Sequence, residues 1–301
     1  MNEARITVLE SRAVLAISGE DRRVFLQGLI SNDINKATES QAIHAAFLTA
    51  QGRFLHEFFA VESAARLLLD TEAARLEDLR KRLAAYKLRA KVALTSLGDD
   101  MIVVAAFGAG SAASFGLQPM AGAAAPHLCG VAFVDPRLAA MGVRLLLPRA
   151  ALSDLTALGS TPASFADYDS WRLSHGVPDG SRDLEIERAL LLENGFDELN
   201  GVDWKKGCYV GQEVTARMKY RALVKRQLTL VRIDGPTPAP GTTIMFNDAK
   251  AGEMRSAAQD QGLALMHVDR LAEIAQGGGQ LVAGEARLTV VTPNGRGRER
   301  G

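Results

Sequence analysis

Hydrophobic residues recur along this chain with a spacing that changes from one segment to the next. Within residues 5–18 the apolar positions alternate, with Val14 and Ala16 on one face and Leu15 and Ile17 on the other, which predicts two short strands. The same pattern of apolar positions predicts further strands at 43–49, 54–61, 66–71, 90–96, 101–106, 130–134 and 143–147.

A period of three to four residues predicts helices between these strands. Asp21 is placed to cap a helix that runs through Ile30. Because helices and strands are mixed and do not alternate regularly, the pattern favours an α+β fold over a doubly wound sheet. Further helices are expected at 72–86, 149–158 and 163–175.

The pattern changes after Tyr220. Short alternating segments separated by prolines and glycines predict a small β-barrel, which we place as a separate domain at 225–293. The charged, glycine-rich residues 294–301 are expected to be a disordered tail. The expected barrel strands are 226–233, 242–246, 250–256, 261–268 and 286–292.

Composition narrows the class of protein. The 301 residues are 47% hydrophobic, and 35 basic residues balance 35 acidic ones. With no net charge, the chain has no global field to attract nucleic acid or membrane, so neither is expected as a partner. No signal peptide follows Met1, and no run approaches the roughly 18 apolar residues of a membrane helix, so a cytoplasmic location is expected.

Two cysteines, Cys129 and Cys208, lie far apart without a Cys-x-x-Cys spacing. This excludes a self-contained zinc or iron–sulfur cage and favours a reducing compartment. The five histidines also lack the spacing of metal ligands.

The segment Lys205–Arg217 concentrates the candidate chemistry around Cys208. Apolar residues at Val210, Val214 and Met218 predict a helix, with Cys208 in its first turn after a sharp bend at the preceding glycine. Unpaired N–H groups and two lysines would favour the thiolate there. The alternative is a small buried hydrophobe beside a solvated rim of lysines.

The run Lys206–Glu213, Lys-Gly-Cys-Tyr-Val-Gly-Gln-Glu, resembles the signature of the YgfZ-type folate-binding proteins, which are relatives of the glycine-cleavage T-protein, an aminomethyltransferase. The resemblance covers most of residues 5–225 and is weaker in the barrel. Other segments similar to landmarks of that family are 25–33, 51–54, 135–137, 176–178 and 192–193.

The resemblance implies a T-protein-like fold, with two interleaved α+β subdomains around a central hole in residues 1–224 and a C-terminal β-barrel. It also implies a folate-dependent accessory protein that assembles or repairs iron–sulfur clusters and so affects tRNA-modifying and other iron–sulfur enzymes. The implied cofactor is tetrahydrofolate or a derivative, and the implied partners are iron–sulfur carrier or client proteins. Since a cluster usually takes four protein ligands, Cys208 would act as a reactive thiolate or as one ligand of a shared cluster.

The rival hypothesis is a tetrahydrofolate-dependent aminomethyltransferase. His56 stands where the T-protein carries a catalytic aspartate, and Ser174-His175 replaces an acidic residue. A neutral histidine cannot supply the charge of a carboxylate, so both departures argue against aminomethyl transfer. Whether any reaction is catalysed stays open.

The resemblance also suggests residues for the folate site. Tyr168 and Trp171 are candidates to stack on the pterin, or else core aromatics of their helix. Asn32 and Asp33 could bond the pterin edge, or else form a turn at a helix end. Arg217 belongs to a basic cluster suited to a glutamate tail or an acidic partner. The signature residues assigned to the same site are Lys206, Gly207, Tyr209, Gln212 and Glu213.

Overall fold

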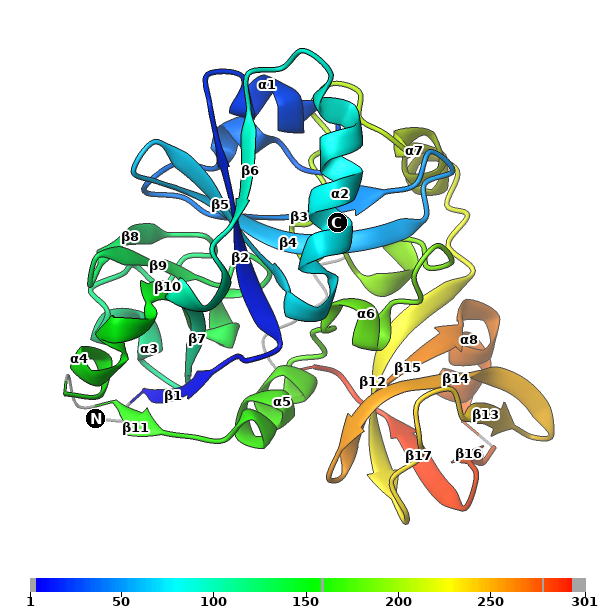
Figure 1. The fold of residues 1–301 in the computed structure, drawn as a ribbon. Helices are drawn as coiled ribbons and strands as arrows, with labels where there is room; N and C mark the ends of the chain where they lie inside the picture. The colour runs from blue at the N-terminus through cyan, green and yellow to red at the C-terminus, as the bar shows by residue number, and fades with distance from the viewer. Residues whose placement is uncertain (1–3, 158–159, 278, 294–301) are drawn as a thin grey trace.

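The computed structural model describes residues 4–157, 160–277 and 279–293 (Figure 1). The tail expected at 294–301 therefore lies outside the described residues. Two sheets and a barrel form the described molecule.

One sheet has five strands in the order β3-β4-β5-β2-β6, and the other has six in the order β11-β1-β7-β10-β9-β8. Because β1 joins strands that come late in the chain and β2 joins strands that come early, the two sheets interleave in sequence. The strand bounds are β1 (Arg5–Val8), β2 (Arg12–Ser18), β3 (Ile43–Leu48), β4 (Phe54–Ser63), β5 (Arg66–Glu72), β6 (Ala93–Ser96), β7 (Met101–Phe107), β8 (Ala124–His127), β9 (Gly130–Val134), β10 (Val143–Pro148) and β11 (Thr161–Pro162).

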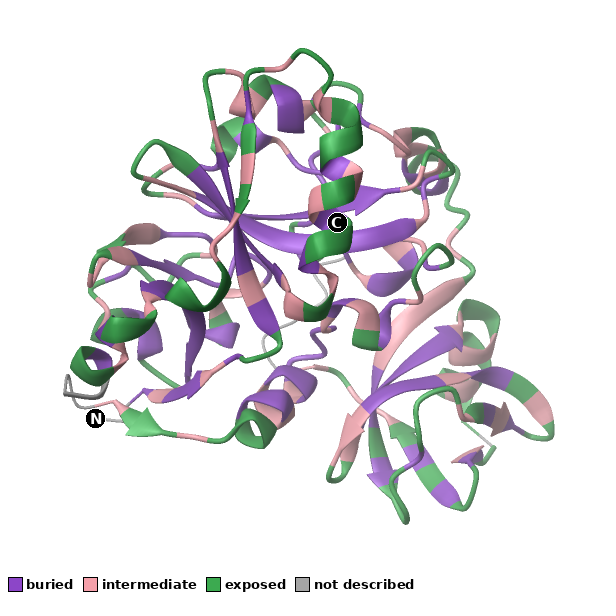
Figure 2. Cartoon of the chain, viewed as in Figure 1, coloured by how far each residue is buried: buried purple, intermediate pink, exposed green. Residues whose placement is uncertain are grey.

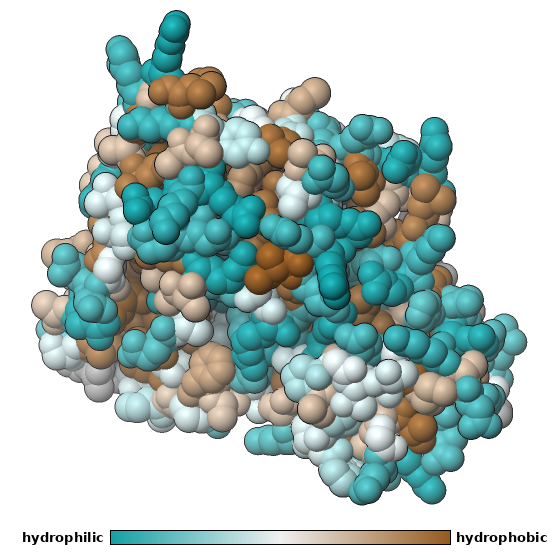
Figure 3. Space-filling model, turned by 45° about the vertical axis from the view of Figure 1, so that its right-hand side comes forward, coloured by the Kyte–Doolittle hydropathy of each residue, from teal (hydrophilic) through white to brown (hydrophobic). Residues whose placement is uncertain are grey.

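Helix α2 covers the outer face of the five-stranded sheet and shows alternating buried and exposed positions (Figure 2). Helices α5 and α6 contact both a sheet and the barrel, and α8 packs on the barrel. The view in Figure 3 is mainly hydrophilic, and its hydrophobic side chains gather only in small groups. The α-helices are α1 (Arg22–Gln27), α2 (Leu76–Lys87), α3 (Ser111–Ser114), α4 (Leu152–Ala157), α5 (Phe165–Ser174), α6 (Gly180–Asp183), α7 (Gln212–Tyr220) and α8 (Val268–Gln276). Short 3₁₀ turns are Ile34–Lys36, Ala73–Arg75, Gly98–Asp100, Ala139–Met141, Arg149–Ala151 and Leu192–Asn194.

The alternation in β2 explains how the sheets are layered. Leu15 and Ile17 enter the core under α1 and α2, whereas Val14 and Ala16 enter the core between the two sheets. Helix α1 ends at Gln27 and is therefore shorter than predicted. Asp21 does not cap it with its side chain, because that carboxylate accepts a hydrogen bond from the Lys91 amide at 2.7 Å.

The C-terminal strands close into a barrel in the order β12-β15-β14-β13-β16-β17, which confirms the predicted α+β class with a terminal barrel. Two of its elements, α8 and the short strand β16, were not predicted. Leu271 and Ile274 of α8 pack against the barrel core. The barrel strands are β12 (Arg226–Asp234), β13 (Thr243–Phe246), β14 (Ala249–Ala258), β15 (Gln261–His267), β16 (Leu281–Ala283) and β17 (Ala286–Val290).

Charged side chains join the barrel to helices α5 and α6 and to the turn at Leu192–Asn194. Arg172 of α5 donates to Asp183 Oδ2 at 3.0 Å and to Ser256 Oγ of β14 at 2.7 Å. The other oxygen of Asp183 accepts from the Ser256 amide at 2.8 Å. Glu193, one of the family-like landmarks, binds Arg226 of β12 at 2.8 Å.

A larger buried ion cluster lies between the two sheets. Arg12 binds Asp70 at 2.6 Å and Glu57 at 3.0 Å, and Arg144 binds the second oxygen of Asp70 at 2.8 Å and Asp135 at 3.1 Å. All these side chains are at most 5% exposed. Asp70 therefore joins two arginines from the two different sheets.

Strand β4 sends adjacent residues to opposite faces of its sheet. His56 points to α2, where its Nε2 contacts Asp78 Oδ2 at 2.9 Å, and its buried Nδ1 has no hydrogen-bond partner. Burial, helped by the positive charge of Arg75, lowers the pKa of His56 to about 4. Glu57 points the other way, into the ion cluster.

The ion cluster predicts a large effect for Asp70→Asn. The substitution keeps the volume but leaves Arg12 and Arg144 without their shared charge, so the free energy of unfolding should fall by about 3–5 kcal/mol. The matched control is Asp99→Asn, because the Asp99 side chain is exposed and 3.9 Å from Arg149. That control should cost less than about 1 kcal/mol. Urea unfolding measures both, and a wild-type midpoint for Asp70→Asn would contradict the prediction.

The acid side of the stability profile tests the buried His56. Its pKa is about 4 in the fold against an ordinary 6.5, so the unfolded chain takes up a proton between these values. The contribution of the neutral His56 to the free energy of unfolding should therefore be fully present above pH 6.5. It should fall as the pH drops toward 4, by on the order of 2–3 kcal/mol. His56→Gln, whose amide does not titrate, should lose less across this window in urea unfolding at several pH values. Equal losses in both chains would show that His56 does not carry the effect.

Candidate functional site

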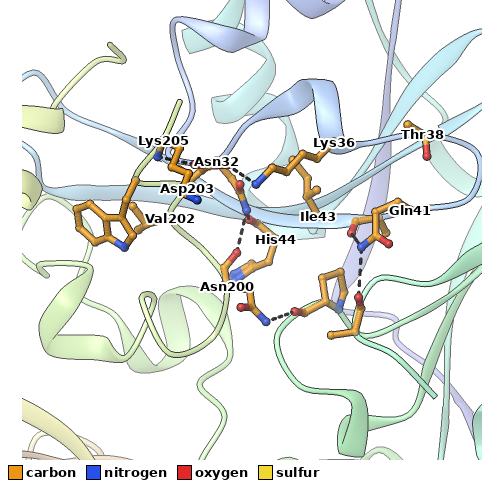
Figure 4. A pocket seen from close by; sticks show the side chains of 14 residues that line it. Asn32, Lys36, Thr38, Gln41, Ile43, His44, Asn200, Val202, Asp203 and Lys205 are labelled. Atoms are coloured by element: carbon orange, nitrogen blue, oxygen red, sulfur yellow. Dashed lines mark hydrogen bonds and ion pairs between the residues drawn. The ribbon is translucent and has the colours of Figure 1, made fainter. Parts of the chain in front are cut away.

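A cavity of about 690 Å³ opens beside the signature segment. Its wall combines the loop after α1, the start of β3 and the residues that lead into the signature (Figure 4). The lining residues are Asn32, Lys36, Thr38, Gln41, Ala42, Ile43, His44, Ala121, Pro136, Asn200, Val202, Asp203, Trp204 and Lys205.

Asn32 joins the parts of this wall. Its amide nitrogen donates to the carbonyl oxygens of His44 and Asn200, both at 2.8 Å, and its side-chain oxygen accepts from the Asp33 amide at 2.8 Å (Figure 4). Asp33 does not line the cavity, because its carboxylate caps the following turn by accepting from the Asn35 amide at 3.0 Å. Asn32 thus lies at the cavity, while Asp33 has the turn role given as its alternative.

The aromatic side chain at the cavity is Trp204, which the sequence reasoning missed. Its indole N–H donates to Asp197 at 2.5 Å, and the Lys219 ammonium lies 4.9 Å from its ring centroid. Lys36 pairs with Asp203 at 2.5 Å on the same wall. The available signal was position alone, since Trp204 immediately precedes the two lysines of the signature.

His44 and Glu57 form the inner side of the site. The two ring nitrogens of His44 contact Glu57 Oε2 at 3.0 Å and the Leu199 carbonyl oxygen at 3.1 Å. Burial alone would raise the pKa of Glu57, but the His44 hydrogen bond and the charges of Arg12 and Arg137 hold it well below its usual range. Glu57 is therefore an ionised carboxylate that is already engaged.

This arrangement corrects the argument built on His56. The residue lies on the sheet face covered by α2, away from the cavity, because side chains alternate along β4. The carboxylate on the interior face is the next residue, Glu57. The absence of an acid at His56 therefore says nothing about aminomethyl transfer.

Tyr168 and Trp171 also lie away from the cavity. Tyr168 is buried between the sheets, where its hydroxyl accepts from Arg144 at 3.0 Å and its ring packs against Phe107. The Trp171 indole donates to the Ala140 carbonyl at 3.2 Å. Tyr168 is a core aromatic of α5, and Trp171 is partly buried against the same core, as the alternative interpretation expected. Neither is among the lining residues.

Cys208 is exposed and precedes the helix. Helix α7 begins at Gln212, so the prediction that placed Cys208 in its first turn is wrong, as is the alternative of a buried thiol. The reason is Gly211, which caps α7 with a positive φ of 82°. Helical hydrogen bonding therefore starts after it, and the helix end lies beyond the thiol.

Two glycines from separate landmarks hold the signature in place. A Cβ on Gly211 would lie 2.4 Å from the Thr49 carbonyl oxygen, and one on Gly52 would lie 2.7 Å from the Gly211 carbonyl oxygen. Both have positive φ, so glycine is required on two counts. Gly207 differs, since its φ is not in this region and an added Cβ would meet nothing within 4 Å. The predicted sharp bend at Gly207 is absent.

The remaining signature residues divide between core and surface. Tyr209 is buried, and burial raises its pKa to about 12. Gln212 accepts from the Tyr209 amide at 3.3 Å. Glu213 and Arg217 are exposed on α7.

Lys206 is the buried member of the pair of lysines. Its ammonium donates to the carbonyl oxygens of Gln27, Ile30 and Asn32 at 2.8, 2.6 and 2.9 Å. Burial lowers the pKa of Lys206 to about 8, whereas the negative charges of Asp33 and Asp203 favour its charged form. Lys205 is exposed at the cavity.

The fold is similar to that of a solved structure. Glycine cleavage system aminomethyltransferase T from Bartonella henselae matches with a TM-score of 0.75 at 13% identity, over 97% of this chain and 86% of that one. At this identity the match shows the fold alone, and it confirms the expected T-protein-like architecture. The model of the CAF17 C-terminal β-barrel domain matches residues 225–295.

Curated relatives carry functional names. The "Iron-sulfur cluster assembly factor IBA57, mitochondrial" of Mus musculus is 31% identical over 94% of this chain and 82% of its own length. The human protein of the same name is 32% identical over 87% and 77%. The Mycosarcoma maydis homolog is 34% identical over 74% of this chain, which spans only 56% of that relative.

These names overturn one expectation and support another in its coarser form. All three relatives are named as mitochondrial, which contradicts the expected cytoplasmic location. The names also place the resemblance with the iron–sulfur assembly factors and make no mention of folate. In the part of the chain that the structure describes, no helix has the length and apolar character needed to span a membrane. At 31% and 32% identity over 94% and 87% of its length to the two mammalian proteins, the chain belongs to the IBA57 family of iron–sulfur cluster assembly factors.

Proposed function

We propose that this chain is a folate-dependent accessory protein for the assembly or repair of iron–sulfur clusters, with effects on tRNA-modifying and other iron–sulfur enzymes. Cys208 is its working group, as a reactive thiolate or as a ligand of a shared cluster. The observation that carries the proposal is the exposed thiol of Cys208 on a loop that continues directly from the cavity wall at Lys205.

The need for a partner follows from the number of ligands. Among the residues that the structure describes, no group of three or more His, Cys, Asp or Glu side chains is arranged to hold a metal ion. One thiolate cannot hold a cluster that usually takes four ligands, so an iron–sulfur carrier or client protein must supply the others. Gly207 beside the thiol leaves room for that approach, because it has no side chain and open space around it.

The cavity fits a folate by size and by chemistry. Its volume of about 690 Å³ is within the roughly 300–1,000 Å³ of small-molecule sites. Trp204 offers a flat apolar surface to a pterin, Asn32 and Asn200 lie at its polar side, and the exposed Lys205 can attract a carboxylate tail. A bound tetrahydrofolate would supply a reduced pterin, which carries one-carbon groups or gives up electrons.

An aminomethyltransferase is the less favoured alternative. The interior carboxylate, Glu57, is held by Arg12 at 3.0 Å and by His44 at 3.0 Å. Both contacts stabilise the anion and use its oxygens, so Glu57 is not free to receive an amine or a folate nitrogen. The family relatives are named as assembly factors, which agrees with this preference.

Folate binding should depend on Trp204. Trp204→Ala removes a stacking surface worth about 0.5–1.5 kcal/mol beyond area, so tetrahydrofolate should bind several-fold more weakly in anaerobic calorimetry. The matched control is Trp171→Ala, the same change away from the cavity, which should bind tetrahydrofolate as the unchanged chain does. No heat and no thermal shift at millimolar tetrahydrofolate in the unchanged chain would remove folate from the proposal.

Cluster function should depend on Cys208. The two exposed cysteines offer a matched pair, because Cys129 lies in the tight turn between β8 and β9. Serine keeps the size but loses the affinity for soft metals, so Cys208→Ser should fold normally, bind folate and fail to support iron–sulfur enzymes in a deletion strain. Cys129→Ser should restore them. Aconitase activity, with protein levels checked, measures both, and full rescue by Cys208→Ser would refute the role given to the thiol.

A further inference from the structure

The Lys206 ammonium makes three hydrogen bonds inside the protein, although it belongs to a surface loop. An ammonium has three N–H donors, and the three carbonyl acceptors Gln27, Ile30 and Asn32 lie within 2.9 Å of it. The ammonium also lies 5.0 Å from the centroid of the Tyr209 ring, a cation–π distance. The side chain therefore has a complete set of partners inside the protein.

The three acceptors belong to one short segment at the end of α1. Gln27 is the last residue of that helix, whose final carbonyl groups lack partners within the helix and carry partial negative charge. Ile30 and Asn32 are buried in the turn that follows. A positive charge at this point satisfies several backbone acceptors that water reaches poorly.

The loop around Cys208 is attached to the same segment on either side. The Asp203 amide donates to the Ser31 carbonyl at 3.0 Å, and the Val210 amide donates to the Gly28 carbonyl at 3.1 Å. Between these two points Lys206 supplies the side-chain attachment. Cys208 thus lies midway between two fixed residues, Lys206 and Val210, while its own side chain is exposed.

We propose that Lys206 is a positioning residue, whose ammonium holds the loop so that the Cys208 thiol is presented to a partner in one orientation. The inference rests on the proposed function only for the statement that Cys208 is the working thiol. The contact between the loop and the 27–32 segment is a separate claim and is tested separately.

The geometry also says why the residue is a lysine. Its three acceptors converge on a single nitrogen, which suits the compact ammonium group. A guanidinium spreads its donors over a planar fork and cannot direct three N–H groups from one atom. Lys206→Arg keeps the charge and should still hold the loop less well.

The experiment compares Lys206→Ala with Lys205→Ala in a Cys129→Ser chain. Hydrogen exchange of the Asp203 and Val210 amides reports the loop. We expect at least tenfold faster exchange at both amides in Lys206→Ala, with barrel amides unchanged, and no change in Lys205→Ala, whose side chain is exposed. Slow exchange at both amides in Lys206→Ala would overturn the proposal.

Amine rescue separates positioning from a general loss of structure. Propylammonium matches the atoms removed by Lys206→Ala and should restore slow exchange, whereas tetramethylammonium has no N–H donor and should not. If Lys206→Ala does not fold, Lys206→Met keeps the apolar stem and takes its place in the exchange measurement. Equal effects of the two cations, or exchange in Lys206→Met as slow as in the unchanged chain, would contradict the assignment.

Complementation of the deletion strain tests whether the position of the loop matters for function. In the deletion strain, Lys206→Ala should support iron–sulfur enzymes poorly and Lys206→Arg partly. Lys81→Ala, which removes an exposed lysine of α2 that does not line the cavity, should support them fully. Fast exchange combined with full support from Lys206→Ala would show that loop position is irrelevant to the working thiol and would overturn the proposal. Full support from Cys208→Ser would instead overturn the proposed function while leaving the exchange result intact.

Discussion

The ion cluster between the two sheets is the constraint on which the rest of the structure depends. Arg12 and Arg144 come from different sheets and share the two oxygens of Asp70, with no measurable exposure of that carboxylate. Removing one member of such a cluster leaves an uncompensated charge in the interior, which is far more costly than the loss of a surface pair. The cluster therefore specifies how the sheets face each other, while the apolar core around it supplies the general driving force for packing.

The position of the candidate site follows from this cluster. Glu57 belongs to it and in turn binds His44, which lies at the cavity. Asn32 then joins His44 to Asn200, so that segments distant in sequence meet at one wall. The polar side of the cavity is thus connected to the buried ion cluster through Glu57 and His44.

The exposed thiol of Cys208 lies on a loop that close backbone packing and a buried lysine hold in place. Gly52 and Gly211 allow two backbones to approach within van der Waals contact, and Lys206 binds the end of α1 from the other side of the thiol. For the role proposed for Cys208, a loop backbone that is already held in place would reduce the ordering needed when a partner binds. The Cys208 side chain is thereby exposed on a loop whose backbone is attached at Asp203 and Val210.

The sequence by itself determined the local elements and the class of protein. Alternation predicted most strands of the two sheets and of the barrel, since side-chain period and burial are local properties, although it missed β8 and β11 of the six-stranded sheet. The signature around Cys208 indicated an iron–sulfur assembly role that the IBA57 relatives support. Tertiary structure decided which residues meet. Tyr168 became a core residue and Trp204 a cavity wall, and a shift of one residue along β4 placed Glu57 in the interior and His56 under α2. A strand pattern shows that neighbours face opposite ways, but only the packing of the second sheet and of α2 determines which face each one meets.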